Sequence, residues 1–319
     1  MKNKAWGTFF IKLAFSALIV FLLLKYNTID LTKVKTALND GQLVFVLMSL
    51  IGVALIFNSY RWMKILLIQK VSASFLPCLK FSVIGIFFNF IIPSSVGGDL
   101  VKAIMAATKW GEAKTKILFS AFIDRLFGLA IMMSVCVAGY FMNFKTLNEL
   151  PEVKQIVLIT SGILALLVVG ILVSHFIVKN NIGEKLISKI KPVLNFSSEL
   201  LNHKFDVFGC ILMSLGSTLA HILFYYSVFV FFGIPIPISI LMFCVPVGTV
   251  ITALPIAPAG VGVGQAVFFY MFNIFDSGMG EIAFLAVTIL QIMYFAWAII
   301  GAIIFSLTPI KLDKLKEVK

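Results

Sequence analysis

Residues 89–105 read NFIIPSSVGGDLVKAIM and interrupt an otherwise apolar part of the chain. A helix that spans lipid needs about twenty mostly apolar residues, because the bilayer core has no water to satisfy a broken backbone. Here the apolar run stops at Pro93, and the apolar pattern resumes at Ala103. Proline ends a helix, and a serine can cap the next one. The stretch therefore predicts two helices joined by a break near the membrane, with the positive N-terminal end of the second helix open.

The composition indicates an all-α membrane protein with several spans. Of the 319 residues, 61% are hydrophobic and 13% are charged, and the mean hydropathy is +1.06. These values are typical of polytopic membrane proteins. A net charge of +12 would suggest nucleic acid in a soluble protein, but here lysines lie where membrane topology and anionic headgroups place them. We therefore expect membrane lipids as partners and no nucleic acid.

The cysteines and histidines give no pattern of a metal or redox site. Cys78, Cys136, Cys210 and Cys244 lie in apolar runs without a CxxC pair, which is typical of buried packing thiols. The three histidines have no partner at metal-ligand spacing, and neither a serine-nucleophile motif nor an ATP-binding loop is present. We expect no cofactor, no metal and no catalytic residue.

The apolar runs predict about eight membrane segments, including broken or re-entrant ones, in a single membrane domain over residues 1–319. The run at 6–24 is interpreted as an uncleaved first span. Most lysines and arginines outside the spans fall on the side of both termini, so we expect both termini in the cytoplasm of a bacterial-type inner membrane. The remaining segments are 42–59, 75–92 with the broken stretch, a long span ending near 143, 153–178, 207–232, 238–254 with a half-helix to 275, and 281–307.

A second broken stretch suggests an internal repeat. Residues 93–97 and 258–262 share the pattern P-x-x-V-G at an offset of 165 positions. The same offset carries the second, third and fourth spans onto the sixth, seventh and last. This pattern predicts two inverted repeats, 1–150 and 151–319, each with a helical hairpin broken at its tip. The alternative is a chance alignment of apolar segments.

If the repeats are real, the two tips approach each other near the midplane. Free backbone N–H groups and positive helix ends would then suit an anionic group such as a phosphate, and glycines would permit close approach. The alternative is that glycine and proline only let helices pack and kink. The candidate residues at the tips are Ser94, Ser95, Gly97, Gly98, Pro258, Gly260 and Gly262.

Charged residues inside the membrane are the sharper signal, because each is costly unless it is paired or hydrated. Asp99 and Lys102 are three residues apart, so they share a helix face and are able to pair. Asp124 and Arg125 are adjacent and lie on different faces. One alternative is a salt-bridge network that only locks the helices; the other is a polar cavity where Lys102 or Arg125 engages a headgroup phosphate. The repeat offset places no charge opposite these positions, so any site should be asymmetric.

Three weaker candidates lie nearby. Arg61 with Trp62 is typical of an interfacial anchor, with headgroup contact as the alternative. Asn89 lies at a helix end, where it either caps the helix or bonds between helices. Gln265 is a candidate for a polar path, although helix packing explains it equally well.

The ordered set of motifs resembles a known family. An R-W pair, then NFIIPSSVGGDLVKA, then DRLFGL, then P-x-x-P-A-G-V-G-V-G-Q is similar to the membrane region of lysylphosphatidylglycerol synthases. The same region forms stand-alone flippase-like membrane proteins and resembles the membrane part of certain archaeal glycosyltransferases. The resemblance covers nearly the whole chain. It gives functional weight to Asn89, Pro93, Gly97, Gly98, Asp99, Asp124, Arg125, Pro258, Gly260 and Gly262.

Two departures from the family pattern matter. Lys102 stands where arginine is usual. Gln265 stands where glutamate is usual, which puts any carboxylate role at that position in doubt.

The resemblance implies movement of a lipid rather than its synthesis. In the two-domain synthases the aminoacyl transfer belongs to a soluble C-terminal domain, for which we expect no room here. We predict a flippase-like transporter that moves an anionic phospholipid or lipid-linked headgroup through a polar cavity between the repeats. One alternative is a membrane-embedded transferase, or an accessory subunit that works with a separate soluble transferase. The other is a structural membrane scaffold.

Overall fold

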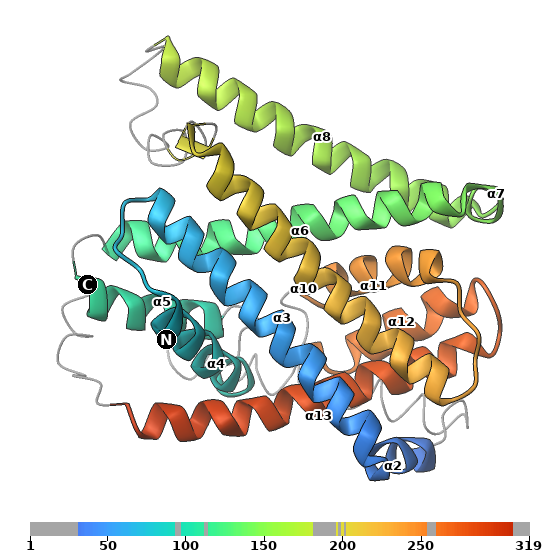
Figure 1. Ribbon diagram of the computed structural model, residues 1–319. Coiled ribbons are helices and arrows are strands. Elements are labelled where there is room, and N and C mark those ends of the chain that lie inside the picture. The colour runs from blue at the N-terminus through green and yellow to red at the C-terminus, as the bar shows by residue number, and fades with distance from the viewer. Residues whose placement is uncertain are drawn as a thin grey trace, which may run out of the picture.

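The computed structural model describes residues 31–92, 97–111, 114–180, 196, 199–200, 202–253 and 260–308. Every regular element in these ranges is a helix (Figure 1). The predicted class, a polytopic all-α membrane protein, is therefore confirmed. The predicted first span at 6–24 and most of the polar loop at 179–206 lie outside the described residues.

Five described helices are long and apolar enough to cross a bilayer. Each has 28 or 29 residues, which at about 1.5 Å per residue gives about 42 Å, enough for a tilted crossing. They are α3 (Gly41–Ile68), α6 (Lys114–Met142), α8 (Pro151–Lys179), α10 (Lys204–Phe231) and α13 (Met279–Ser306). Two shorter helices, α2 (Leu31–Asn39) and α7 (Phe144–Leu147), flank long ones.

Four further helices are too short to cross the membrane alone. They are α4 (Phe75–Ile91), α5 (Gly97–Trp110), α11 (Ile238–Thr252) and α12 (Val263–Asn273). Their 11 to 17 residues reach only about 16 to 26 Å. α4 packs against α5, and α11 packs against α12. Two broken hairpins therefore lie where the sequence predicts them, although residues 93–96 and 254–259 at their tips lie outside the described residues.

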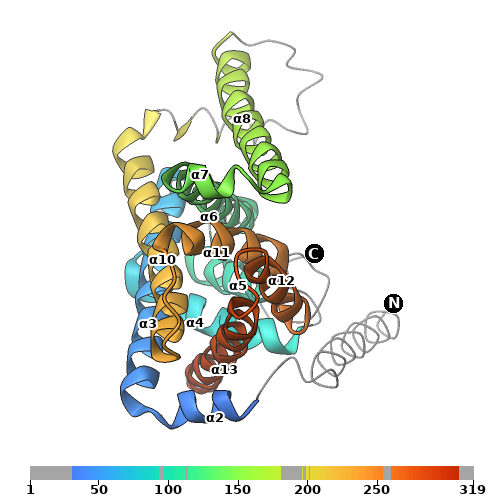
Figure 2. The ribbon, with the colours of Figure 1, turned by 90° about the vertical axis from the view of Figure 1, so that its right-hand side faces the viewer.

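Helices of the first half of the chain pack against helices of the second half. α3 and α10 lie side by side and run in opposite directions (Figure 1). Consistent with this, Lys64 near the end of α3 bonds Asp206 near the start of α10. α4 packs against α13, and α11 packs against α6, so each broken hairpin rests on a long helix of the other half. α8 packs mainly against α6 and lies at the edge of the bundle (Figure 2).

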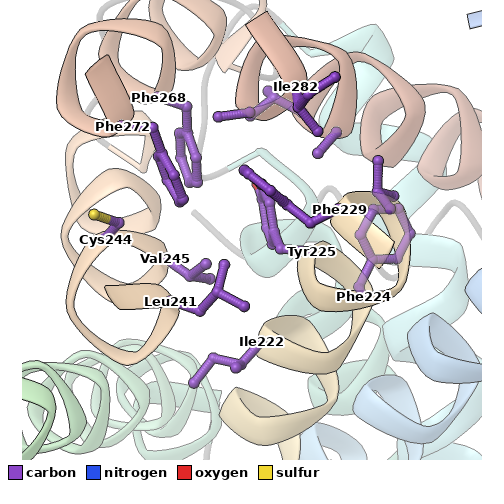
Figure 3. Packing of buried hydrophobic residues seen from close by; sticks show 14 of the residues in the cluster. Ile222, Phe224, Tyr225, Phe229, Leu241, Cys244, Val245, Phe268, Phe272 and Ile282 are labelled. Atoms are coloured by element: carbon purple, nitrogen blue, oxygen red, sulfur yellow. The ribbon is translucent and has the colours of Figure 1, made fainter. Parts of the chain in front are cut away.

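Aromatic side chains hold the second hairpin in place. Tyr225 of α10 stacks on Phe268 of α12, with ring centroids 4.9 Å apart, and Phe229 stacks on Phe272 at 5.4 Å (Figure 3). All four rings are buried. Large aromatic rings bury about 150–250 Å² each, which explains how the 11-residue α12 is anchored by packing rather than by its own helix stability.

The first hairpin depends on a close approach at Gly98. A Cβ added there would overlap the carbonyl oxygen of Gly85 and lie 2.6 Å from Asn89 Oδ1. We predict that Gly98→Ala forces α4 and α5 apart and costs about 1–3 kcal/mol, as overpacking does in other cores. Thermal unfolding of the purified protein in detergent will measure this as a lower Tm.

Gly162 provides the matched control for this substitution. It lies in α8, and a Cβ added there meets nothing within 4 Å. Gly162→Ala should leave the Tm unchanged or raise it, because alanine favours a helix over glycine by about 0.5–1 kcal/mol. Equal Tm values for the two variants would contradict the close-approach explanation.

Candidate functional site

Asp124 lies at the centre of a charge network inside the membrane region. Its carboxylate accepts a hydrogen bond from Arg61 Nε of α3 at 2.7 Å and another from Lys102 Nζ of α5 at 3.1 Å. All three residues are buried. A buried carboxylate with two cationic donors is compensated, whereas an isolated charge in this environment would be very costly.

The two cations have further partners that fix their positions. Arg61 Nη1 donates to Ser214 Oγ of α10 at 3.1 Å. Lys102 Nζ lies 4.6 Å from the ring centroid of Trp62, within reach of a cation–π interaction. Trp62 Nε1 in turn donates to Ser120 Oγ at 2.9 Å. The network therefore joins α3, α5 and α6 of the first half to α10 of the second.

The prediction of Arg61 and Trp62 as an interfacial anchor is wrong, because both side chains are buried. The sequence placed the end of this span near residue 59, but α3 continues to Ile68. The helix passes through these polar positions because Asp124 compensates Arg61, and because Asp206 pairs with Lys64 at 2.8 Å.

The other end of the network is more accessible. Asp99 Oδ1 lies 3.5 Å from Lys102 Nζ, and Asp99 Oδ2 lies 3.7 Å from Arg125 Nη1. The side chains of Arg125 and Asp99 are 25% and 34% exposed, against 7% for Asp124. The network thus has a buried core and an exposed outer pair. A substrate group can reach only the outer pair without unfolding the core.

Arg125 connects the two broken hairpins. Its Nη2 donates to the carbonyl oxygen of Ala253 at 3.0 Å. Ala253 is the last described residue before the second break and caps the C-terminal end of α11. Asp99, the ion-pair partner of Arg125, lies in the first turn of α5, directly after the first break. One guanidinium therefore contacts the helix after the first break and the helix before the second.

The charges follow the predicted pattern. Asp99 and Lys102 share a face and pair, while Asp124 and Arg125 point to different partners. Three cations and two carboxylates make up this described network, which leaves one net positive charge. An anion at the accessible end would neutralise it.

The N-terminal end of α5 is partly occupied rather than open. The backbone N–H of Gly98 donates to Asn89 Oδ1 at 2.8 Å. Asn89 is near the end of α4, so the hairpin satisfies one of its own exposed N–H groups. Asn89 therefore bonds between helices, which is one of its two predicted roles. Gly97 and Gly98 are buried in this contact, while Pro93, Ser94 and Ser95 lie outside the described residues.

Gln265 has a comparable role at the second break. Its Oε1 accepts from the N–H of Gly262 at 2.8 Å, and its Nε2 donates to Gln291 Oε1 at 2.7 Å. Gly260 and Gly262 adopt positive φ angles of 69° and 81°, which favour glycine. Gln265 is buried, so in this structure it caps α12 and links it to α13. Pro258 lies outside the described residues.

The sequence does not predict the roles of Ser214 and the Ala253 carbonyl. A serine in an apolar helix or a backbone oxygen carries no pattern that distinguishes it. The contacts of His221 in α10 link it to α13 without a carboxylate: His221 Nδ1 donates to the Ser217 carbonyl, and Tyr294 donates to His221 Nε2 at 2.8 Å. No cluster of three potential metal-binding side chains occurs among the described residues.

Broken hairpins and a charge network inside a helix bundle define an integral membrane protein with a polar centre. The chain belongs to the family described as the lysylphosphatidylglycerol synthase TM region, whose model matches residues 9–301. This confirms the resemblance found in the sequence. The chain is 24% identical over 235 residues to the UPF0104 membrane protein MJ1078 of Methanocaldococcus jannaschii. The aligned region covers 73% of this chain and 98% of that protein. No solved structure matches the chain significantly.

The buried core of the network should be required for folding. We predict that Asp124→Asn leaves Arg61 buried without its countercharge and Lys102 with only the Asp99 carboxylate, and costs about 3–5 kcal/mol, as breaking a buried ion pair does elsewhere. The loss should appear as a lower Tm and as less monodisperse protein in size-exclusion chromatography.

Asp99→Asn is the matched control, because it removes the same charge from the exposed end of the network. Its Tm should fall much less than that of Asp124→Asn. If Asp124→Asn is as stable as the wild type, the core of the network does not hold the helices together.

The Gln265 cap gives a separate prediction. Gln265→Leu removes both side-chain hydrogen bonds, whereas Gln291→Leu removes only the bond between the two amides. A buried donor left without a partner costs about 1–3 kcal/mol. Thermal unfolding should therefore show a larger loss for Gln265→Leu. Equal losses would indicate that the contact with the Gly262 N–H contributes nothing.

Proposed function

We propose that this protein moves the anionic headgroup of a lipid across the bilayer, past Arg125, which contacts one helix of each broken hairpin. The observation that carries the proposal is the position of Arg125, between Asp99 after the first break and Ala253 before the second. A guanidinium binds a phosphate through two parallel hydrogen bonds. The family description names the membrane region of a synthase of a phospholipid, which supports lipid as the substrate class.

The contacts of Arg125 favour exchange with a substrate. Its separation of 3.7 Å from Asp99 is longer than a hydrogen bond, so the ion pair is loose. The network carries one net positive charge, which an incoming phosphate would balance. The rigid core around Asp124 would hold α5 and α6 in place during the exchange. Asp99 and Arg125 are therefore the residues expected to meet the headgroup, while the buried Lys102 holds Asp99 from the inner side.

The two-half arrangement supports a transport role. Residues 1–150 and 151–319 would form repeats of opposite membrane orientation, with both termini in the cytoplasm. In support, α3, α4, α5 and α6 recur in order and similar length as α10, α11, α12 and α13, and α3 runs opposite to α10. Transporters built from inverted repeats bind substrate near the midplane, at the ends of discontinuous helices.

Two measurements on Arg125 variants test the proposal. Lipids retained by the purified protein will be identified by mass spectrometry, and fluorescent phosphatidylglycerol will be followed across proteoliposome membranes. Arg125→Gln should lose the anionic lipid enriched on the wild type and slow flipping at least tenfold. Arg125→Lys should recover part of both, because it keeps the charge but not the paired hydrogen bonds.

Lys64→Gln is the matched control, because it removes one positive charge near the end of α3, where Lys64 pairs with Asp206. It should retain lipid and flip it at the wild-type rate. Equal lipid retention by the wild type, Arg125→Gln and Lys64→Gln would overturn the proposal. Modification of the lipid only after a soluble transferase is added would instead favour the accessory-subunit alternative.

A further inference from the structure

We infer that an apolar groove between α6, α8 and α11 holds a hydrocarbon chain of the lipid whose headgroup engages Arg125. This inference rests on the proposed function and adds the second half of the binding site. The groove is formed by side chains of all three helices, among them Met133, Cys136, Thr160, Ile163, Pro246 and Val250.

The chemistry of the groove fits hydrocarbon and not a headgroup. Its lining residues are almost all aliphatic, and Thr160 turns its hydroxyl onto the carbonyl of Ile156 in its own helix at 2.7 Å. The cavity volume is about 200 Å³. An apolar cavity of about 150 Å³ is enough to bind benzene, so this one has room for a segment of one chain.

Two of the helices that line the groove, α6 and α11, also carry the residues of the Arg125–Ala253 contact. On α6, Cys136 follows Arg125 by eleven residues, which is close to three helical turns and places both on one face. On α11, Val250 and Ile251 precede Ala253, the residue whose carbonyl Arg125 holds, by about 5 Å or less along the helix axis. A lipid with its phosphate at Arg125 would therefore have its chain beside the faces of α6 and α11 that line the groove.

The third wall explains why the chain can enter from the bilayer. α8 packs mainly against α6, and it lies at the edge of the bundle (Figure 2). Its outer face carries side chains such as Leu158 and Leu166, which are 75% and 73% exposed. The groove thus lies between the bundle and a peripheral helix, where lipid tails have access without crossing the core.

Photo-crosslinking tests the groove directly. Wild-type protein in nanodiscs will be irradiated with phosphatidylglycerol that carries a diazirine on one acyl chain. Diacylglycerol with the same labelled chain is the control probe, because it lacks the phosphate. We expect crosslinks at Cys136, Thr160 and Pro246 to be at least fivefold stronger with phosphatidylglycerol, and crosslinks at Leu158 to be equal for the two probes.

The outcomes separate this inference from the proposed function. Equal labelling of groove and outer-face residues by both probes would mean that the groove holds only bulk lipid, and would overturn the inference. If Arg125→Gln still loses its retained anionic lipid in that case, the headgroup site stands alone. If neither lipid retention nor groove labelling depends on Arg125, the proposed function fails first.

A pair of substitutions gives an independent check. Thr160→Trp fills the groove, whereas Leu158→Trp adds the same ring to the outer face of the same helix. Both are compared as monodisperse protein. Thr160→Trp should abolish groove labelling and slow flipping of fluorescent phosphatidylglycerol at least fivefold, with Leu158→Trp unchanged. Undiminished labelling at Cys136 and Pro246 in Thr160→Trp would contradict the inference.

Discussion

The burial of Asp124 between Arg61 and Lys102 is the constraint on which the rest of the structure depends. Charges inside a bilayer must be paired or hydrated, and this carboxylate is reached by one cation from α3 and one from α5. Each partner fixes another element, since Arg61 also bonds α10 through Ser214. The helices α3, α5, α6 and α10 are therefore held in register by groups that lipid cannot solvate. The accessible pair of Arg125 and Asp99 is carried by two of these helices, α6 and α5.

The broken hairpins are possible because they satisfy their own backbone. A helix end in lipid exposes N–H groups that have no water to bond. At the first break, Asn89 Oδ1 accepts a hydrogen bond from the N–H of Gly98. At the second, Gln265 Oε1 accepts one from the N–H of Gly262. In both cases an amide side chain satisfies a backbone N–H without adding a charge. The glycines allow the close backbone approach that such caps require.

Local sequence patterns predicted much of this fold, because apolar length and helix-breaking residues act locally. The sixth, seventh and last spans begin and end within about three residues of their predicted limits, and the shared face of Asp99 and Lys102 follows from helical spacing. The burial of Arg61 was not predictable, because its partner Asp124 lies on another helix. The contact of Arg125 with Ala253 joins positions 128 apart in the chain, and no local rule encodes such a contact.

The bond between Arg125 and the Ala253 carbonyl has a consequence for the resting state. The guanidinium pairs with the Asp99 carboxylate and donates a hydrogen bond to the backbone of α11. Small ions that enter from either side would have to compete with groups already in place. Under the proposed function, a headgroup that carries a phosphate would compete because it offers charge and two acceptors together. The contact that positions the Arg125 guanidinium would thus also limit the leakage of small ions across the membrane.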